Sequence, residues 1–303
     1  MSQIESTHKP RDVEEVIDIY FYRPIGYMIA RVSKSLAITP NAVTVISIII
    51  GMIAGHLFYY HDLWTNVIGM LLLILSEAMD SADGQLARMT NRHSRLGRIL
   101  DGFAGNLIFI SIYVHLCLRL MTEGSSAWIF AVAVLSALSH SFQCAMADYY
   151  RNAYLYFVYG EQKSELDKSA SIAGTFQRIT WTGSPVKKFL VRIYLNYTYQ
   201  QELLARNFQR LYATTRERYG VTVPDWLSER YMEGNRPLLK YYNFITTNTR
   251  IIALFIALFI NRVFLYFAFE LIVLNAVLFI LTLYQEKLNA RLLRMIEIPE
   301  GVH

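Results

Sequence analysis

The sequence predicts an all-α integral membrane protein with six transmembrane helices. Of its 303 residues, 54% are hydrophobic and 17% are charged. Several apolar stretches approach the roughly 20 residues that a helix needs to cross a bilayer. The six stretches are residues 43–60, 64–79 with a polar continuation to 88, 99–118, 127–147, 245–260 and 263–284. Buried helices of a large soluble protein are the alternative, and the number and length of these stretches argue against it.

Residues 1–40 precede the first span and predict an amphipathic helix that lies on the membrane surface. Charged and apolar side chains alternate along this segment, and Pro24 is expected to interrupt the helix. Thr39, Pro40 and Asn41 then open the first span. Proline ends the preceding helix there, and a polar side chain can cap the next one.

The remaining chain divides by hydropathy and charge. Residues 41–149 hold the first four spans, 150–242 form a polar insertion, 243–290 hold the last two spans, and 291–303 are a tail. Within the insertion, residues 186–220 place apolar side chains at helical spacing among seven Lys or Arg and two Glu. Two interpretations stay open: a helical hairpin packed on the protein's own surface, or a basic arm on the membrane.

The distribution of Lys and Arg predicts the orientation. The segments before span one, between spans two and three, between spans four and five, and after span six are basic. The loops HDLWTN (61–66) and TEGSSA (122–127) contain neither Lys nor Arg. The basic segments, and with them both termini, are therefore expected in the cytoplasm. No basic segment followed by an apolar stretch and a cleavage site opens the chain, so no signal peptide is expected.

Three aspartates are expected to converge where span two ends and span three begins: Asp80, Asp83 and Asp101. Ionisable groups at the edge of a bilayer are costly, and they normally face a bundle interior or a water-filled cavity. Three carboxylates would repel one another at low dielectric unless a cation lay between them. Oxygen ligands suit Mg²⁺, Mn²⁺ or Ca²⁺, and carboxylate-bound Mg²⁺ commonly binds substrate phosphates. The pattern therefore predicts a Mg²⁺ or Mn²⁺ site at the cytoplasmic face.

Small residues and an arginine accompany these aspartates. Gly84 and Gly97 remove side chains where a bulky ligand would approach the backbone, and Ala87 allows close helix packing. Arg88 offers a guanidinium that matches phosphate. A solvated loop at the membrane surface is the alternative for these charges. It accounts for the neighbouring Arg92 but not for the three aspartates.

The spacing of these residues resembles the signature of the CDP-alcohol phosphatidyltransferase family. Seven positions agree with it: Asp80, Asp83, Gly84, Ala87, Arg88, Gly97 and Asp101. The Thr-Pro-Asn opening of the first span and the number of spans also agree. The resemblance implies transfer of a phosphate-linked group from a CDP-activated donor to a hydroxyl, with release of CMP.

The resemblance also implies roles for these residues. Asp80, Asp83 and Asp101 would bind the divalent metal and the donor pyrophosphate, and Asp101 would also count as catalytic. The nucleotide and phosphate site would include Asn41, Gly84, Ala87, Arg88 and Gly97. The partners implied are a CDP-activated substrate, a lipid substrate and the membrane. A homodimer stays open, and no nucleic acid is expected.

One position departs from the family pattern. Where the family has a fourth aspartate, assigned as metal ligand and catalytic base, this chain has Gly105. The chain is then a weakened or inactive member, or another group supplies the carboxylate. Glu77 is the favoured substitute, because antiparallel spans place it at the depth of Gly105. Asp148 and His140 are further candidates, although an interfacial aspartate and a hydrogen-bonded histidine explain them as well.

The acceptor is the least determined part of the prediction. Arg151 and Arg250, at the cytoplasmic mouths of spans four and five, could receive an anionic acceptor, since guanidinium groups match phosphate. They could equally be ordinary positive-inside residues. An inositol-type headgroup on a glycerolipid or sphingolipid is the weakly favoured product.

Two other classes of function remain as alternatives. A membrane scaffold that binds metal or nucleotide without catalysis is favoured by Gly105 and disfavoured by the other motif residues. A cation transporter is the second. It would need polar or broken helices beyond the site and often repeated halves, and residues 43–60 and 106–118 provide neither.

Overall fold

The computed structural model describes residues 10–92 and 95–297, without the side chains at positions 11, 95–99, 101 and 102. Every regular element in these ranges is a helix, which confirms the all-α prediction. In chain order they are η2 (Arg11–Val13), η3 (Asp18–Tyr22), α1 (Arg23–Ser35), α2 (Pro40–Leu57), α3 (Leu63–Thr90), α4 (Arg95–Thr122), α5 (Ile129–Tyr159), η4 (Glu161–Lys163), α6 (Ser169–Arg178), α7 (Pro185–Leu204), α8 (Arg206–Tyr219), α9 (Asp225–Phe244), α10 (Thr247–Phe259), α11 (Phe264–Ala268), η5 (Phe269–Leu274) and α12 (Asn275–Glu297).

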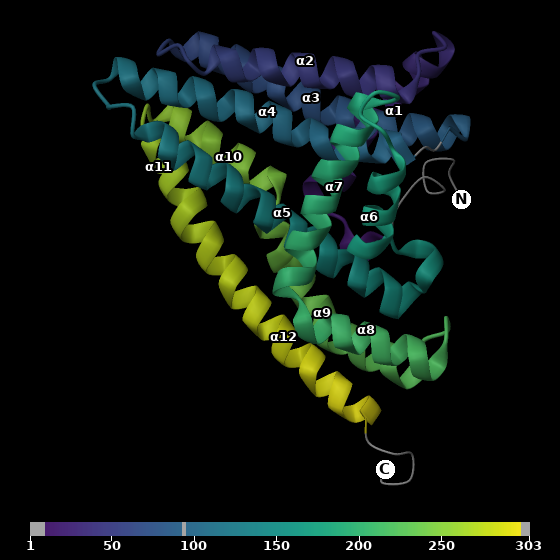
Figure 1. The fold of residues 1–303 in the computed structure, drawn as a ribbon. Helices are drawn as coiled ribbons and strands as arrows, with labels where there is room; N and C mark the ends of the chain where they lie inside the picture. Colours follow the sequence, from purple (N-terminus) through teal and green to yellow (C-terminus); the bar gives the residue numbers. More distant parts are fainter. Residues whose placement is uncertain (1–9, 93–94, 298–303) are drawn as a thin grey trace.

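Six helical segments are long and apolar enough to cross a membrane, as the sequence predicts. The first four are α2, α3, α4 and α5; α9 with α10 forms the fifth, and α11, η5 and α12 form the sixth. In Figure 1, α2, α3 and α4 run alongside one another, while α12 diverges from them towards the C-terminus. The end where α3 finishes and α4 starts is called the motif side here. The N-terminal helices and the insertion lie on that side.

Proline has different effects at its two positions before the first span. α2 starts as predicted, because Thr39 Oγ1 accepts a hydrogen bond from the N–H of Ala42 at 3.3 Å and Pro40 occupies the first turn. Pro24 does not interrupt its helix, which corrects the sequence expectation. The π-helix η3 leads directly into α1, and Pro24 lies in the first turn of α1, where a missing N–H is tolerated.

Glycines bring the helices of the first half close together. A Cβ on Gly51 of α2 would lie 2.7 Å from the side chain of Ile108 on α4. A Cβ on Gly69 of α3 would lie 2.7 Å from the ring of Phe58. Small residues at such crossings let helix backbones approach each other in a membrane. The same contacts fix α3 and α4, which carry the motif, relative to each other.

On the motif side, α5, α8, α9 and α12 enclose a second core rich in aromatic side chains. Its largest members are Tyr149, Tyr150, Tyr154, Tyr156, Phe157, Phe208, Tyr231 and Tyr242. Glu286 of α12 accepts hydrogen bonds from the backbone N–H groups of Asn207 (2.5 Å) and Phe208 (3.2 Å). It therefore caps the N-terminus of α8. This half of the insertion packs on the protein itself, as the hairpin interpretation expects.

One buried ion pair lies inside the spans that the structure describes. Arg250 of α10 and Glu270 of η5 are both 0% exposed, and Nε of the arginine lies 3.2 Å from Oε1 of the glutamate. Tyr113 and Tyr266 donate hydrogen bonds to the same Oε1 at 2.8 and 2.9 Å. Glu270 lies in a π-helix, which shifts the register of the side chains around it. This ion pair joins the fifth and sixth spans to α4.

Candidate functional site at the ends of α3 and α4

The aspartate Asp83 points from α3 towards α2. It is 4% exposed, and its Oδ2 accepts a hydrogen bond from Oγ1 of Thr44, which is also buried. A hydroxyl donor fixes the orientation of a carboxylate. The sequence places Thr44 at the opening of the first span, but its partnership with Asp83 becomes visible only in the fold.

A second face of α3 stays partly open. Its residues follow one another at steps of three and four and are all half-buried: Glu77, Asp80, Gly84, Ala87 and Arg88. Ala78, Ala82 and Leu86, which lie between them, are buried in the packing, whereas Met79 and Ser81 are half-buried. Asp80 therefore lies on an accessible line of the helix, while Asp83 is turned inward. The carboxylates of Asp80 and Asp83 therefore leave α3 on two different faces.

The guanidinium of Arg88 folds back along this open face. A Cβ on Gly84 would lie 3.7 Å from both Nη1 and Nη2 of Arg88. The absence of a side chain at position 84 thus leaves room next to the guanidinium. A fork-shaped cation above a bare stretch of helix is suited to a phosphate group.

The position of the missing fourth aspartate is open. A Cβ added to Gly105 of α4 would meet no atom within 4 Å. The described surroundings can therefore accommodate a side chain here, either one built on residue 105 or one that reaches in from a neighbour. Asp101 and Gly97 belong to α4, but the side chain of Asp101 and the surroundings of Gly97 lie outside the described part of the structure.

The structure therefore describes the side chains of only two of the three predicted metal ligands. Among the side chains that the structure describes, no three His, Cys, Asp or Glu residues form a group that could hold a metal ion. The side chains of Asp80 and Asp83 are among those described, and the side chain of the third predicted ligand, Asp101, is not. The two described carboxylates lie one helical turn apart on α3.

The N-terminal helices bring further acidic residues to α3. Burial raises the pKa of Tyr22 above its ordinary value, and the carboxylates of Glu77, Asp18 and Glu15 raise it further. Glu77 therefore lies at the boundary between α3 and the N-terminal segment. α1 packs closely here, since a Cβ on Gly26 would lie 3.0 Å from Ser81 Oγ.

Arg151 belongs to a polar group beside this boundary. Its Nη2 donates a hydrogen bond to Asn243 Oδ1 at 3.1 Å, and the residue is half-buried. Glu15 accepts hydrogen bonds from Thr246 Oγ1 and, at 2.7 Å, from Asn248 Nδ2. Burial raises the pKa of Glu15, while these two hydrogen bonds and the charge of Arg151 lower it in part.

Arg250 differs from Arg151 in being enclosed. Besides Glu270, its guanidinium contacts the carbonyl oxygen of Ile245 (2.7 Å) and Oε1 of Gln143. The side chain has no exposed surface. This geometry argues against the expected acceptor contact at Arg250, because the guanidinium is used inside the bundle. The partner was detectable in principle, since Glu270 is the one acidic residue in the sixth apolar stretch.

The other predicted residues occupy varied surroundings. Asn41 is exposed in the first turn of α2. His140 is buried, with Nδ1 3.1 Å from Tyr113 Oη and its ring against Phe109, which fits the hydrogen-bonded alternative. Asp148 is half-buried and accepts a hydrogen bond from Asn152 Nδ2 at 3.1 Å.

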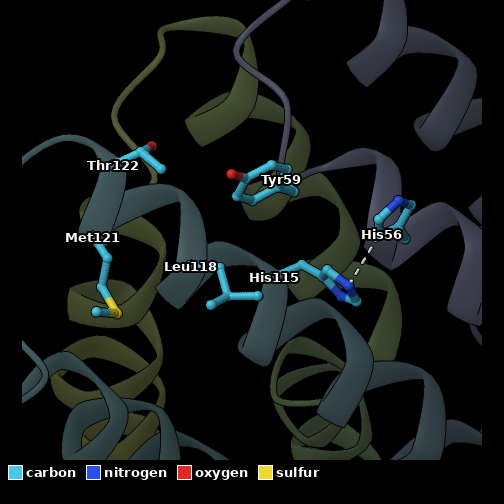
Figure 2. A pocket seen from close by; sticks show the side chains of 6 residues that line it. All are labelled: His56, Tyr59, His115, Leu118, Met121 and Thr122. Atoms are coloured by element: carbon cyan, nitrogen blue, oxygen red, sulfur yellow. Dashed lines mark hydrogen bonds between the residues drawn. The ribbon is translucent and has the colours of Figure 1, made fainter.

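A separate cavity of about 390 Å³ lies at the opposite ends of α2 and α4 (Figure 2). It is lined by His56, Tyr59, His115, Leu118, Met121 and Thr122. Figure 2 shows the two imidazoles pointing towards each other, with 3.1 Å between His56 Nδ1 and His115 Nε2. The cavity is far along both helices from the motif, so it is distinct from the candidate site.

Comparison with known proteins points to the same part of the chain. Residues 37–163 match the family model of the CDP-alcohol phosphatidyltransferases. Archaetidylinositol phosphate synthase of Pyrococcus horikoshii is 33% identical over 90 residues, which cover 30% of this chain and 46% of that protein. A putative cardiolipin synthase of Mycobacterium tuberculosis is 29% identical over 97 residues, or 32% of this chain and 44% of that protein. The chain thus spans less than half of either relative, and no solved structure matches it.

Proposed function

Because residues 37–163 match the family model of the CDP-alcohol phosphatidyltransferases, we propose that this protein transfers a phosphate-linked group from a CDP-activated donor to a hydroxyl and releases CMP. The observation that carries the proposal is the end of α3. Asp83 is oriented there by Thr44, and Asp80 and Arg88 lie on a partly open face beside Gly84. Acid and guanidinium groups beside bare backbone are the groups that a metal-bound pyrophosphate needs.

The residues present fit a divalent metal. Asp80, Asp83 and Asp101 would hold Mg²⁺ or Mn²⁺, since all three offer only oxygen. The hydroxyl of Thr44 donates to Oδ2 of Asp83 and orients this carboxylate. When bound, such a metal neutralises charge on the pyrophosphate and orients it for displacement.

The protein's own groups would supply binding and orientation. Arg88 would pair with a phosphate of the donor, and Gly84 would let the donor approach the helix. Asn41, exposed at the start of α2, would contact the nucleotide. Positioning of both substrates accounts for a large part of such a reaction, because it replaces an encounter in solution.

Glu77 is our candidate for the base that accepts the proton of the acceptor hydroxyl. It is half-buried on the same face as Asp80, and position 105 offers space for a side chain. We expect Glu77→Gln to abolish turnover while donor binding is largely retained. Glu77→Ala combined with Gly105→Asp should restore part of the CMP release. Parent-like turnover of Glu77→Gln would rule out this role and make Asp148 the next candidate.

For the acceptor, we propose an inositol-type headgroup that enters from the cytoplasm, the side to which the basic segments point. A relative is named archaetidylinositol phosphate synthase, and Arg151 is the half-buried cation beside the site that could meet a phosphate. The resulting lipid would be a phospholipid or sphingolipid, and the site would open to both bilayer and water.

The test is CMP release by the purified protein in lipid nanodiscs. CDP-diacylglycerol is paired with inositol phosphate, inositol or glycerol phosphate, and CDP-linked headgroups are paired with diacylglycerol or ceramide, each with Mg²⁺, Mn²⁺ or chelator. Metal-dependent CMP release with an inositol-type acceptor supports the full proposal. Donor binding without CMP release from any pair would instead identify a non-catalytic scaffold, the function that Gly105 favours.

A further inference from the structure

Helix α7 crosses the bundle near the start of α4. The ring of Phe189 on α7 contacts the ring of Phe103 on α4, with centroids 6.0 Å apart at 86°. Phe103 lies in the first third of α4, two residues after Asp101 in the sequence. In Figure 1, α7 lies across α4 and α5, and it contacts both helices. The helix α7 therefore lies crosswise against α4 and α5 on the motif side.

The two faces of α7 differ in their surroundings. One face is buried against the protein and contains Leu190, Val191, Leu195 and Thr198. The other face carries exposed large apolar side chains near both ends of the helix, with exposed fractions from 49% to 71%, and Arg192 and Asn196 between them: Val186 and Phe189 near the start, Tyr199 and Leu203 near the end. A row of this kind on a water-facing surface is unfavourable, so it requires cover.

The charge of the same segment indicates what covers it. Residues 169–204 contain four Lys or Arg and one Glu: Arg178, Lys187, Lys188, Arg192 and Glu202. Lys188 Nζ lies 4.6 Å from the ring centroid of Phe176 and 5.5 Å from that of Trp181. Trp181, in the turn between α6 and α7, is 54% exposed. Exposed tryptophan with neighbouring cations is typical of segments in the headgroup layer of a membrane.

We propose that residues 169–204, the α6–α7 arm, lie in the headgroup layer of the motif-side leaflet and bind anionic phospholipids. The apolar row of α7 enters the acyl boundary, and Lys187, Lys188 and Arg192 meet lipid phosphates. Because Phe189 contacts α4 two residues after Asp101, the arm borders the end of the helix that carries the motif. It gathers anionic lipid next to the site.

Spin-label depth measurements test the position of the arm. Nitroxides are attached at Val186→Cys and Leu203→Cys in a chain whose Cys117 and Cys144 are replaced by alanine. Val221→Cys, which is equally exposed but lies in the turn after α8, is the matched control. In nanodiscs we expect labels 186 and 203 to collide more with oxygen than with a water-soluble nickel chelate, and label 221 to show the reverse.

Labels at 186 and 203 that favour the nickel chelate would overturn the proposal. So would labels shielded from both reagents in a protein that runs as a dimer, because the face would then be a contact between two copies. The spin-label measurement of depth does not depend on enzymatic turnover. Failure of the arm and failure of the enzymatic proposal are therefore distinguishable.

The preference for anionic lipid is tested by quenching of the fluorescence of Trp181. The Trp181 signal is the fluorescence of the parent minus that of Trp181→Phe. Brominated phosphatidylglycerol should quench more than brominated phosphatidylcholine. Lys187→Gln with Lys188→Gln should reduce that preference by about fivefold for each cation removed. Equal quenching by the two lipids, or a preference unchanged in the double variant, would contradict the anionic specificity.

Discussion

The hydroxyl of Thr44 orients Asp83, which is the most buried of the candidate-site carboxylates that the structure describes. Thr44 on α2 donates to Asp83 on α3, so a residue of the first span controls a predicted metal ligand on the second. Hydrogen bonds to charged groups contribute about 1.5–3 kcal/mol, more than neutral ones. The orientation of Asp83 therefore depends on close packing of α2 and α3.

We predict that Thr44→Val, which keeps the side-chain shape and removes the donor, weakens metal activation of CMP release by roughly 10- to 100-fold. Thr44→Ser should stay near the parent, since it keeps the hydroxyl. The measurement is CMP release against Mn²⁺ concentration. Thr215→Val is the matched control, because Thr215 is a buried threonine of α8 that donates to the carbonyl of Leu211. An unchanged Mn²⁺ requirement in Thr44→Val would show that the contact is only structural.

At the scale of elements, the N-terminal helices are tied to the last third of the chain. Glu15 joins Thr246 and Asn248 at the start of α10, and Asp18 accepts from the same Asn248 at 2.9 Å. This arrangement holds η3 and α1 against α3, where Glu77 lies. The N-terminal helices thereby become part of the wall of the candidate site.

The raised pKa of Glu15 predicts how these contacts of the N-terminal helices respond to pH. A carboxyl whose pKa is raised on folding is stabilising below its ordinary pKa of about 4.3, and the contribution is lost as pH rises through the folded value. Hydrogen exchange of η3 and α1, corrected for intrinsic rates, should therefore quicken as pH rises above this ordinary pKa. Glu15→Gln should remove that dependence, and Glu15→Ala should quicken exchange at every pH. A pH dependence that persists in Glu15→Gln would assign it to another group.

Hydropathy predicted which segments form the membrane-spanning helices. It did not predict which side chains of different helices contact each other. The six spans were recognisable because membrane crossing imposes a length and an apolar composition on each segment. The role of Arg250 was not recognisable, because its partner Glu270 lies on another span and the pairing depends on the bundle. The break at Ala205 that separates α7 from α8 follows from tertiary contacts such as Glu286, which an apolar periodicity over 186–220 does not contain.

The whole molecule combines a close-packed half, which carries the motif, with a half built around buried polar groups. Arg250 and Glu270 connect the last two spans to α4 through Tyr113. Removing one member of a buried pair costs about 3–5 kcal/mol, while replacing both by apolar residues is often neutral. Stability of this half should therefore depend on the match between the two charges.

We predict that Glu270→Ala lowers the free energy of unfolding by about 3–5 kcal/mol, because it leaves Arg250 as an unpaired buried charge. Arg250→Met combined with Glu270→Leu should recover most of the loss. Unfolding by sodium dodecyl sulfate in mixed micelles measures both variants. If the double variant were as unstable as Glu270→Ala, specific hydrogen bonds rather than charge pairing would hold these spans.

The central claim is that aspartates at the end of α3 and the start of α4 support a metal-dependent release of CMP. The most direct measurement compares CMP release by the parent, Asp83→Asn, Asp101→Asn and Asp62→Asn, with Mg²⁺ or Mn²⁺, at matched amounts of folded protein. Asp62 is the control, because it caps the other end of α3 by accepting from the N–H of Thr65 at 2.8 Å. We predict that the first two substitutions abolish CMP release and that Asp62→Asn leaves it near the parent rate. Parent-like CMP release by folded Asp83→Asn and Asp101→Asn would contradict the claim.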